Sequence, residues 1–158
     1  MAASPSAAAS AMTPVQKQLS TLVVKQGLGL GGLSRSLQTL ALALAWAGLG
    51  DEVMTEPEVN AALKAQLSGA AAFMATDHVE LRRTLIDAGW LQRDGFGREY
   101  RRVACDQLRE DLRDIAVEVS AMDLPQWVAQ RHAAVAQQRE QGRQAWLAAQ
   151  SSQSHIKS

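Results

Sequence analysis

Apolar residues recur every three or four positions along most of the chain, which is the pattern of helices that bury one face. Most of these repeats begin after a residue that can cap a helix, and several end at a glycine. Four helices are predicted in the first part of the chain, over residues 14–26, 35–47, 56–66 and 77–88. Two more are predicted after them, over residues 105–122 and 123–150.

The signals for the helix starts are specific. Thr13 and Thr55 are each followed, three positions later, by Gln16 or Glu58, which is the spacing of a capping box. A proline stands in the first turn after each threonine, where its missing N–H costs nothing. Gly89 stands where the helix 77–88 should end. The helix boundaries therefore rest on capping chemistry as well as on periodicity.

After Gly89 the pattern changes from a helical period to alternation. Residues 90–93 and 98–103 flank a turn, Asp-Gly-Phe-Gly, whose glycines can supply the positive φ angles of a tight hairpin. Three helices followed by a hairpin is the order of a winged helix. The predicted fold is therefore mainly α with one small β-hairpin, a winged-helix-like module with extra N- and C-terminal helices.

With 158 residues the chain has the size of one domain, and its segments differ in composition. The expected divisions are a disordered N-terminus (1–12), an N-terminal helix with a glycine-rich linker (13–33), a winged-helix-like domain (34–104), C-terminal helices (105–150) and a disordered tail (151–158). Met12 would also serve as a start of translation.

The linker contains a G-x-G-x-x-G pattern at Gly27, Gly29 and Gly32. A dinucleotide-binding loop needs a strand before these glycines and a helix directly after them. Here a helix precedes them and no βαβ alternation exists, so the pattern predicts a flexible link between two helices and no cofactor.

Charge is balanced overall but uneven along the chain. The chain contains sixteen Lys and Arg residues and sixteen Asp and Glu residues, whereas a dedicated nucleic-acid binder usually has a basic excess. Residues 78–103 carry a net charge of +2, and residues 104–124 carry −4. The acidic segment could neutralise the basic one or lie on another face.

Several classes of function are excluded. Cys105 is the only cysteine and no second histidine lies at a metal-binding spacing from His78, so no disulfide, metal site or cofactor is expected. No nucleophile motif or carboxylate pair points to an enzyme. The most apolar run is too short for a membrane span, and the N-terminus is a poor signal peptide, so a cytoplasmic protein is expected.

Two stretches carry a resemblance to a known family. "TEPEVNAAL" (55–63) and "DHVELRRTLIDAGWLQRDGFGREYRR" (77–102) resemble the bacterial domain of unknown function 2087, over about residues 38–103. Its pattern pairs an E-V-N helix start with D-H-x-x-L-R-R-x-L-x-D-x-G-x-L-x-R-D-x-x-G-x-x-Y. The resemblance implies a winged-helix module associated with transcriptional regulators, without a catalytic activity. The connection 68–76 is longer than in a usual helix-turn-helix.

In such a module the helix 77–88 would enter the major groove. Helical spacing places Arg83 and Thr84 on its outer face, and His78 in its first turn. Arg83 would contact guanine or phosphate. The alternative is a surface ion pair, because Glu80 and Asp87 lie three and four positions from it.

The hairpin would supply the contacts to phosphate. Its candidates are Arg93, Arg98, Arg101 and Arg102. The alternative is a solvated strand edge that its charges protect from aggregation. Arg82, next to the core stripe, is expected to be structural and to bond helix caps or Asp94. Phe96 is an apolar residue at an exposed tip.

The sequence thus favours a small bacterial DNA-binding protein, a transcriptional regulator with a reader helix (77–88) and an arginine-rich wing (90–103). The alternative is a protein–protein interaction module on the same scaffold without DNA. Its support is the neutral net charge, the acidic helix and the tryptophans of the last helix. A homodimer through the C-terminal helices fits both hypotheses.

Overall fold

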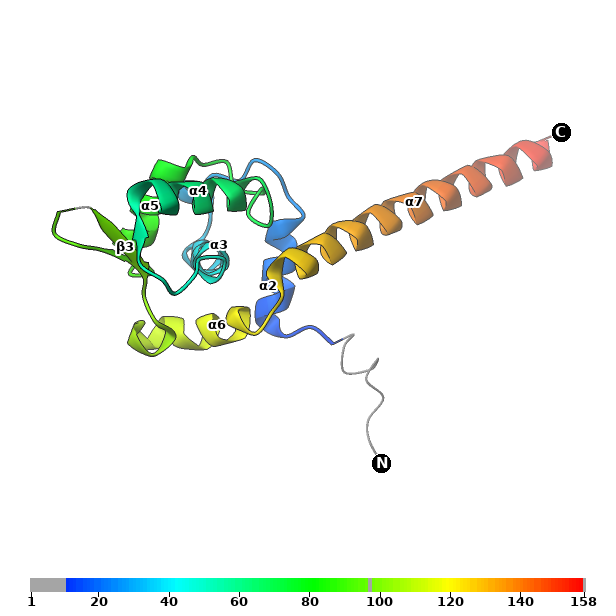
Figure 1. Cartoon of the computed structure of the whole chain (residues 1–158). Coiled ribbons are helices and arrows are strands. Elements are labelled where there is room, and N and C mark those ends of the chain that lie inside the picture. Colours follow the sequence, from blue (N-terminus) through cyan, green and yellow to red (C-terminus); the bar gives the residue numbers. More distant parts are fainter. Residues whose placement is uncertain (1–10, 97, 158) are drawn as a thin grey trace, which may run out of the picture.

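The computed structural model describes residues 11–96 and 98–157 and shows a mainly α fold with a small antiparallel sheet, as expected. The helices form one body, the sheet lies at one end of it, and the last helix projects from the other end (Figure 1). The elements in chain order are α2 (Pro14–Val23), η1 (Leu30–Gly32), α3 (Arg35–Ala47), β1 (Met54–Thr55), α4 (Glu56–Leu67), α5 (His78–Asp87), β2 (Leu91–Arg93), β3 (Glu99–Arg102), η2 (Cys105–Gln107), α6 (Glu110–Ser120) and α7 (Leu124–Lys157).

Helix α3 is the centre of the body. Seven consecutive residues, 40–46, are buried, so this helix has no solvent face over its second half. Helices α4 and α5 lie on one side of α3, and α6 lies on the other (Figure 1). Trp46 packs against Trp90 with ring centroids 5.5 Å apart, and its Nε1 donates to the carbonyl of Val103 at 2.8 Å. These contacts connect the central helix to the residues just before β2 and just after β3.

Thr13 and Thr55 cap their helices as predicted, but only Thr13 forms the expected capping box, because the Glu58 carboxylate accepts from the Thr55 hydroxyl. The Thr13 hydroxyl accepts from the Gln16 N–H, and the Gln16 side chain accepts from the Thr13 N–H, which completes a capping box. The Ser34, Thr55 and Asp77 side chains each accept from the N–H of the third helical residue. Side-chain oxygens therefore satisfy N–H groups that the helix itself leaves unpaired.

Helix α5 ends at a glycine, as predicted. Gly89 has φ +86°, and the N–H of Trp90 donates to the carbonyl of Leu85 at 2.9 Å. The N–H of Gly89 donates to the carbonyl of Ile86 at 3.2 Å, which completes a Schellman motif. This turn directs the chain from α5 into β2.

The sheet has three strands, whereas the sequence predicted a two-stranded hairpin. β3 lies between β2 and β1, and Met54 and Thr55 pair with Tyr100 and Glu99. A two-residue strand shows no alternation, so periodicity could not reveal β1.

The turn of the hairpin also differs from the expectation. Gly95 does not have a positive φ, and Gly97 lies outside the described residues. Instead the Asp94 carboxylate accepts from the backbone N–H of Arg98 at 2.7 Å and of Glu99 at 3.3 Å. A side-chain acceptor therefore organises the turn, as in other Asp-containing turns.

The glycine-rich segment is fixed in place, in contrast to the flexible link predicted from its composition. Leu28 donates to the carbonyl of Phe73 at 2.9 Å and accepts from the N–H of Ala75 at 2.8 Å. Leu30 is buried in the core. The segment is thus held by the connection that precedes α5.

Two further boundaries differ from the predictions. The helix expected over 105–122 is broken, because Leu108 and Arg109 are extended (ψ 156° and 148°) and the Leu108 side chain is buried. α7 continues to Lys157, although a disordered tail was expected from residue 151. That tail is polar but contains no proline or glycine that would end a helix. The disordered N-terminus expected over residues 1–12 falls mostly on residues 1–10, which lie outside the described residues.

Candidate nucleic-acid interface

Helix α5 turns Leu81 and Leu85 into the core and leaves Arg83 exposed. Among the described residues Arg83 has no carboxylate oxygen within 4.0 Å, so it does not form the alternative ion pair. Glu80 instead accepts from the Thr76 hydroxyl at 3.0 Å. The Arg83 guanidinium therefore faces solvent without a carboxylate partner.

The other two candidates on α5 are less accessible. Thr84 is half-buried, and its hydroxyl donates to the carbonyl of Glu80 at 2.8 Å. It lines a cleft of about 280 Å³ between α5, α3 and the start of α6, together with Arg35 and Arg109. His78 is half-buried at the first position of the helix. The prediction that Thr84 and Arg83 share an outer face is therefore only partly met, since Thr84 turns toward α3.

Arg82 is structural, as expected, and its partners lie on α4. Its Nη1 contacts Glu56 at 3.2 Å and donates to the side chain of Asn60. Its guanidinium also lies 5.4 Å from the centre of the Tyr100 ring. With its side chain only 15% exposed, Arg82 joins α5 to α4 and the sheet.

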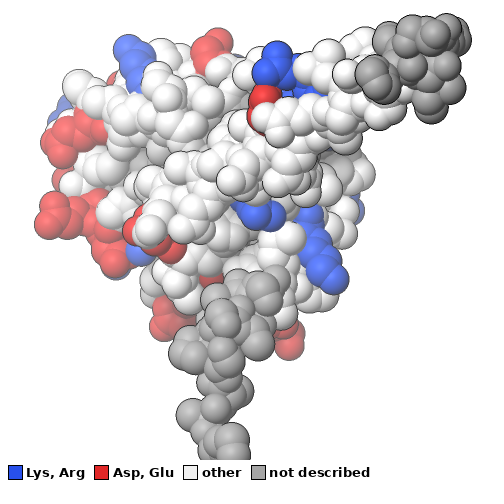
Figure 2. Space-filling model, turned by 90° about the vertical axis from the view of Figure 1, so that its right-hand side faces the viewer, with Lys and Arg blue, Asp and Glu red and all other residues white. Residues whose placement is uncertain are grey.

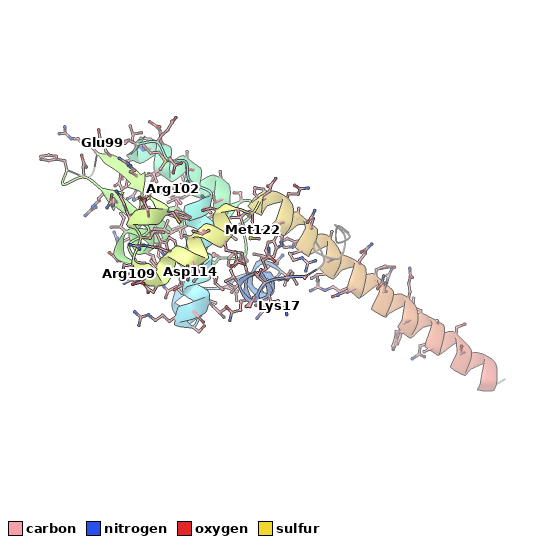
Figure 3. The ribbon with its side chains drawn as sticks, turned by 90° about the horizontal axis from the view of Figure 1, so that it is seen from below. Lys17, Glu99, Arg102, Arg109, Asp114 and Met122 are labelled. Carbon is pink, nitrogen blue, oxygen red and sulfur yellow. The ribbon has the colours of Figure 1, made fainter. Side chains whose placement is uncertain are left out.

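Arg102, predicted as a phosphate contact, instead donates hydrogen bonds to other groups of the protein. Its Nε bonds Asp51 at 2.7 Å, and its Nη1 donates to the carbonyls of Trp46 at 3.3 Å and Ala47 at 3.4 Å. The guanidinium thus caps the C-terminal carbonyls of α3, where a positive charge is favoured. Figure 3 shows Arg102 between the hairpin and the helices, with Glu99 farther out along the strand. Because these contacts engage its donors, we leave Arg102 out of the candidate interface.

Asp51 shows the electrostatic effect of this arrangement. The hydrogen bond and the charge of Arg102, with a smaller contribution from the charge of Arg101, hold the pKa of the Asp51 carboxyl below its ordinary value.

The exposed hairpin arginines lie on different faces of the sheet. Arg93 pairs with the buried Tyr100, and Arg101 pairs with the exposed Gln92. Side chains directly opposite each other in a sheet share a face, and successive residues alternate. Arg93 therefore lies on the side that faces the helices, and Arg101 lies on the opposite side. Arg98 stands near the tip, 5.8 Å from the centre of the Phe96 ring.

The acidic helix α6 does not cover these arginines. It packs against α3, on the side away from α4 and α5 (Figure 1), and both Arg83 and Arg101 are exposed. The face from which α7 projects is mostly uncharged, with acidic side chains gathered along one edge (Figure 2). The exposed arginines of α5 and the hairpin are therefore free of the acidic segment that follows them in the sequence.

The two halves of the motif found in the sequence meet at the contact of Arg82 with Asn60. Residues 34–102 match the model of DUF2087, described as an uncharacterized protein conserved in bacteria. The match confirms the predicted resemblance and extends from the cap of α3 to the end of β3. No curated protein and no solved structure matches the chain. Within the matched segment, Asp77, Gly89 and Asp94 have structural roles as a cap, a helix stop and a turn acceptor.

The described residues contain neither a metal-binding cluster nor a membrane-spanning helix. No group of three or more His, Cys, Asp and Glu side chains in residues 11–96 and 98–157 could hold a metal ion. No helix in the same part of the chain combines the length and the apolar character needed to cross a membrane.

Sequence reasoning missed two features of this region. Arg102 and Asp51 are 51 positions apart, and no local pattern links them. Arg35 and Arg109 meet at the cleft beside Thr84 although they come from separate segments. In both cases the packing of α3 against distant elements brings the residues together. The periodicity of the sequence does not predict such contacts.

Proposed function

We propose that this chain binds duplex DNA through a basic surface formed by Arg83 of α5 and by Arg93 and Arg98 of the hairpin. The observation that carries the proposal is that these three side chains are exposed and have no carboxylate partner among the described residues. Arginines of this kind bind phosphate by releasing counterions.

The topology supports this function. The order from α3 to β3 is helix, strand, helix, helix, strand, strand, with the last strand between the other two. This order is similar to that of a winged helix, in which the third helix enters the major groove and the hairpin contacts the backbone. Here α5 is that third helix, and Arg93 lies on the side of the hairpin that faces the helices. Because a fold alone does not define function, the arginines carry the argument.

The charges predict weak and salt-dependent binding. Glu80 and Asp87 lie on the same helix as Arg83 and repel phosphate, and the whole chain has no net charge. Three phosphate contacts would give a slope of log K against log salt of about −2.7. Such a module would act as a small bacterial transcriptional regulator, without chemistry of its own.

The test compares two variants that carry the same change in charge. Arg93→Ala should weaken binding of a fluorescent random duplex and lower the salt slope by about 0.9. Arg101→Ala, on the opposite face of the hairpin, should leave the slope nearly unchanged. Equal losses in both variants would contradict the assignment to the face of Arg93. If the wild-type chain does not bind the duplex, the alternative function, a protein–protein interaction module, would be favoured.

A further inference from the structure

The second half of α7 extends away from the rest of the protein. Leu124 and Val128 are buried, but every residue from 136 to 152 is exposed, and the helix stands clear of the body (Figure 1). The helix continues to Lys157, so the projecting segment 136–157 is about 33 Å long at 1.5 Å per residue. A single helix of this length is only marginally stable in water without a partner.

Two large apolar side chains, Trp146 and Leu147, lie at the middle of this segment. Trp146 is 60% exposed and Leu147 is 51% exposed, and they are the two central residues of 136–157. Gly142 and Ala149 lie one turn before and after Trp146 on the same face of the helix. A Cβ atom at Gly142 would meet nothing within 4 Å. The face therefore has one large apolar side chain between two small residues, which allows a second helix to approach closely.

The body formed by the described residues does not cover this face. α7 is one continuous helix that carries Trp146 about 33 Å from Leu124, so the tryptophan cannot reach its own body. The body surface at the base of the helix is mostly uncharged (Figure 2). The described body therefore supplies no partner for Trp146, whereas another molecule could.

We infer that a second copy of this chain covers it, with the two α7 helices antiparallel and a two-fold axis beside Trp146 and Leu147. The projecting segments then overlap along their whole length, and Trp146 and Leu147 of both copies meet at the centre. Such an interface is closed and self-complementary.

The charge pattern selects the antiparallel orientation. Within the projecting segment before Trp146 the charged residues are Arg139, Glu140 and Arg143, while residues 144–154 carry no charge. In the antiparallel pair, residues 139–143 of one helix lie level with the uncharged 150–154 of the other. A parallel pair in register would place each charged side chain beside its own copy, which is repulsive.

This inference is independent of the proposed function. The pairing places the two bodies at opposite ends of the helix bridge and uses no residue of α5 or of the hairpin. A failure to bind DNA would leave the dimer intact, and a monomeric chain could still bind DNA.

The first test is the molar mass of the full chain by light scattering after gel filtration at about 100 μM. We expect about 34 kDa, twice the 17.0 kDa of the monomer. The double variant Trp146→Glu with Leu147→Glu should weaken dimerisation at least tenfold, because four carboxylates would meet at the axis. Phe96→Glu is the matched control, since it adds a charge at an aromatic residue 84% exposed in the hairpin, and it should remain dimeric. A monomeric wild-type chain, or a double variant that still dimerises fully, would overturn the inference.

The second test distinguishes the two orientations by cross-linking. In a Cys105→Ser background, Ala149→Cys lies close to the axis and should form covalent dimers with a short bismaleimide. Arg139→Cys lies seven residues before Trp146, so its copies would be roughly 22 Å apart along the antiparallel pair and should not be linked. Efficient linkage at position 139 would show a parallel pair and overturn the antiparallel assignment.

Discussion

Two adjacent arginines of α5 should have separable effects on stability and binding. Arg82 is 15% exposed and contacts Asn60, Glu56 and the ring of Tyr100, whereas Arg83 is exposed and has no carboxylate partner among the described residues. Arg82→Met keeps most of the apolar stem of the side chain and removes these polar contacts. Arg83→Met removes the same charge from the same helix and serves as the matched control.

The magnitude follows from the contacts of Arg82. A hydrogen bond that involves a charged group contributes about 1.5 to 3 kcal/mol. The contact with the Tyr100 ring adds roughly 0.5 to 1 kcal/mol. Glu56 is 51% exposed, so solvent screens its ion pair and we assign it almost nothing. Since these contributions are not additive, we expect Arg82→Met to lower the free energy of unfolding by about 2 kcal/mol.

The measurement is urea unfolding followed by tryptophan fluorescence, with duplex binding measured at low salt. Arg82→Met should unfold at lower urea, and Arg83→Met should remain within about 0.5 kcal/mol of the wild type. Binding should weaken for Arg83→Met at a protein concentration where both variants are folded. Equal destabilisation by the two substitutions would refute the different roles assigned to these arginines.

Three further predictions concern the fold. Gly89→Ala should cost about 1 to 2 kcal/mol because an alanine is strained at φ +86°, whereas Gly29→Ala, at φ −74° with open space at its Cβ, should be neutral or slightly stabilising in the same urea titration. Trp46→Phe should lower the melting temperature, since it removes the buried hydrogen bond of Nε1 to a backbone carbonyl, and an unchanged melting temperature would contradict the role of that bond. Asp51 has a lowered pKa in the folded state, so its bond to Arg102 should stabilise the protein above the ordinary carboxyl pKa and lose this effect as the pH falls through the lowered value. Asp51→Asn should therefore lose less stability than the wild type between pH 5 and pH 3 in thermal unfolding, and identical pH profiles would argue against it.

The sequence predicts the helices well because their starts and stops are local. Thr13, Thr55 and Asp77 cap the helices that follow them, and Gly89 ends α5 with a positive φ. Each of these signals acts within four or five residues, so composition and spacing suffice to find it.

Features that depend on packing were not predictable in the same way. β1 is two residues long and exists because β3 lies beside it, and the glycine-rich segment is fixed by hydrogen bonds of Leu28 to residues 73 and 75. Arg102 has the same local context as the other hairpin arginines, yet β3 places it against the end of α3. In the candidate site, the exposure of Arg83 could be predicted from helical periodicity. The hydrogen bonds of Arg102 could not, because they depend on how β3 packs against α3.

The salt dependence of duplex binding tests the central claim most directly. A fluorescent random duplex is titrated with the wild-type chain at several salt concentrations between about 50 and 200 mM, and the affinity is followed by anisotropy. We expect saturable binding at the lowest salt and a slope of log K against log salt between about −2 and −3, as three phosphate contacts require. No binding at 50 mM salt, or an affinity that does not change with salt, would contradict the assignment of Arg83, Arg93 and Arg98 as a phosphate-binding surface.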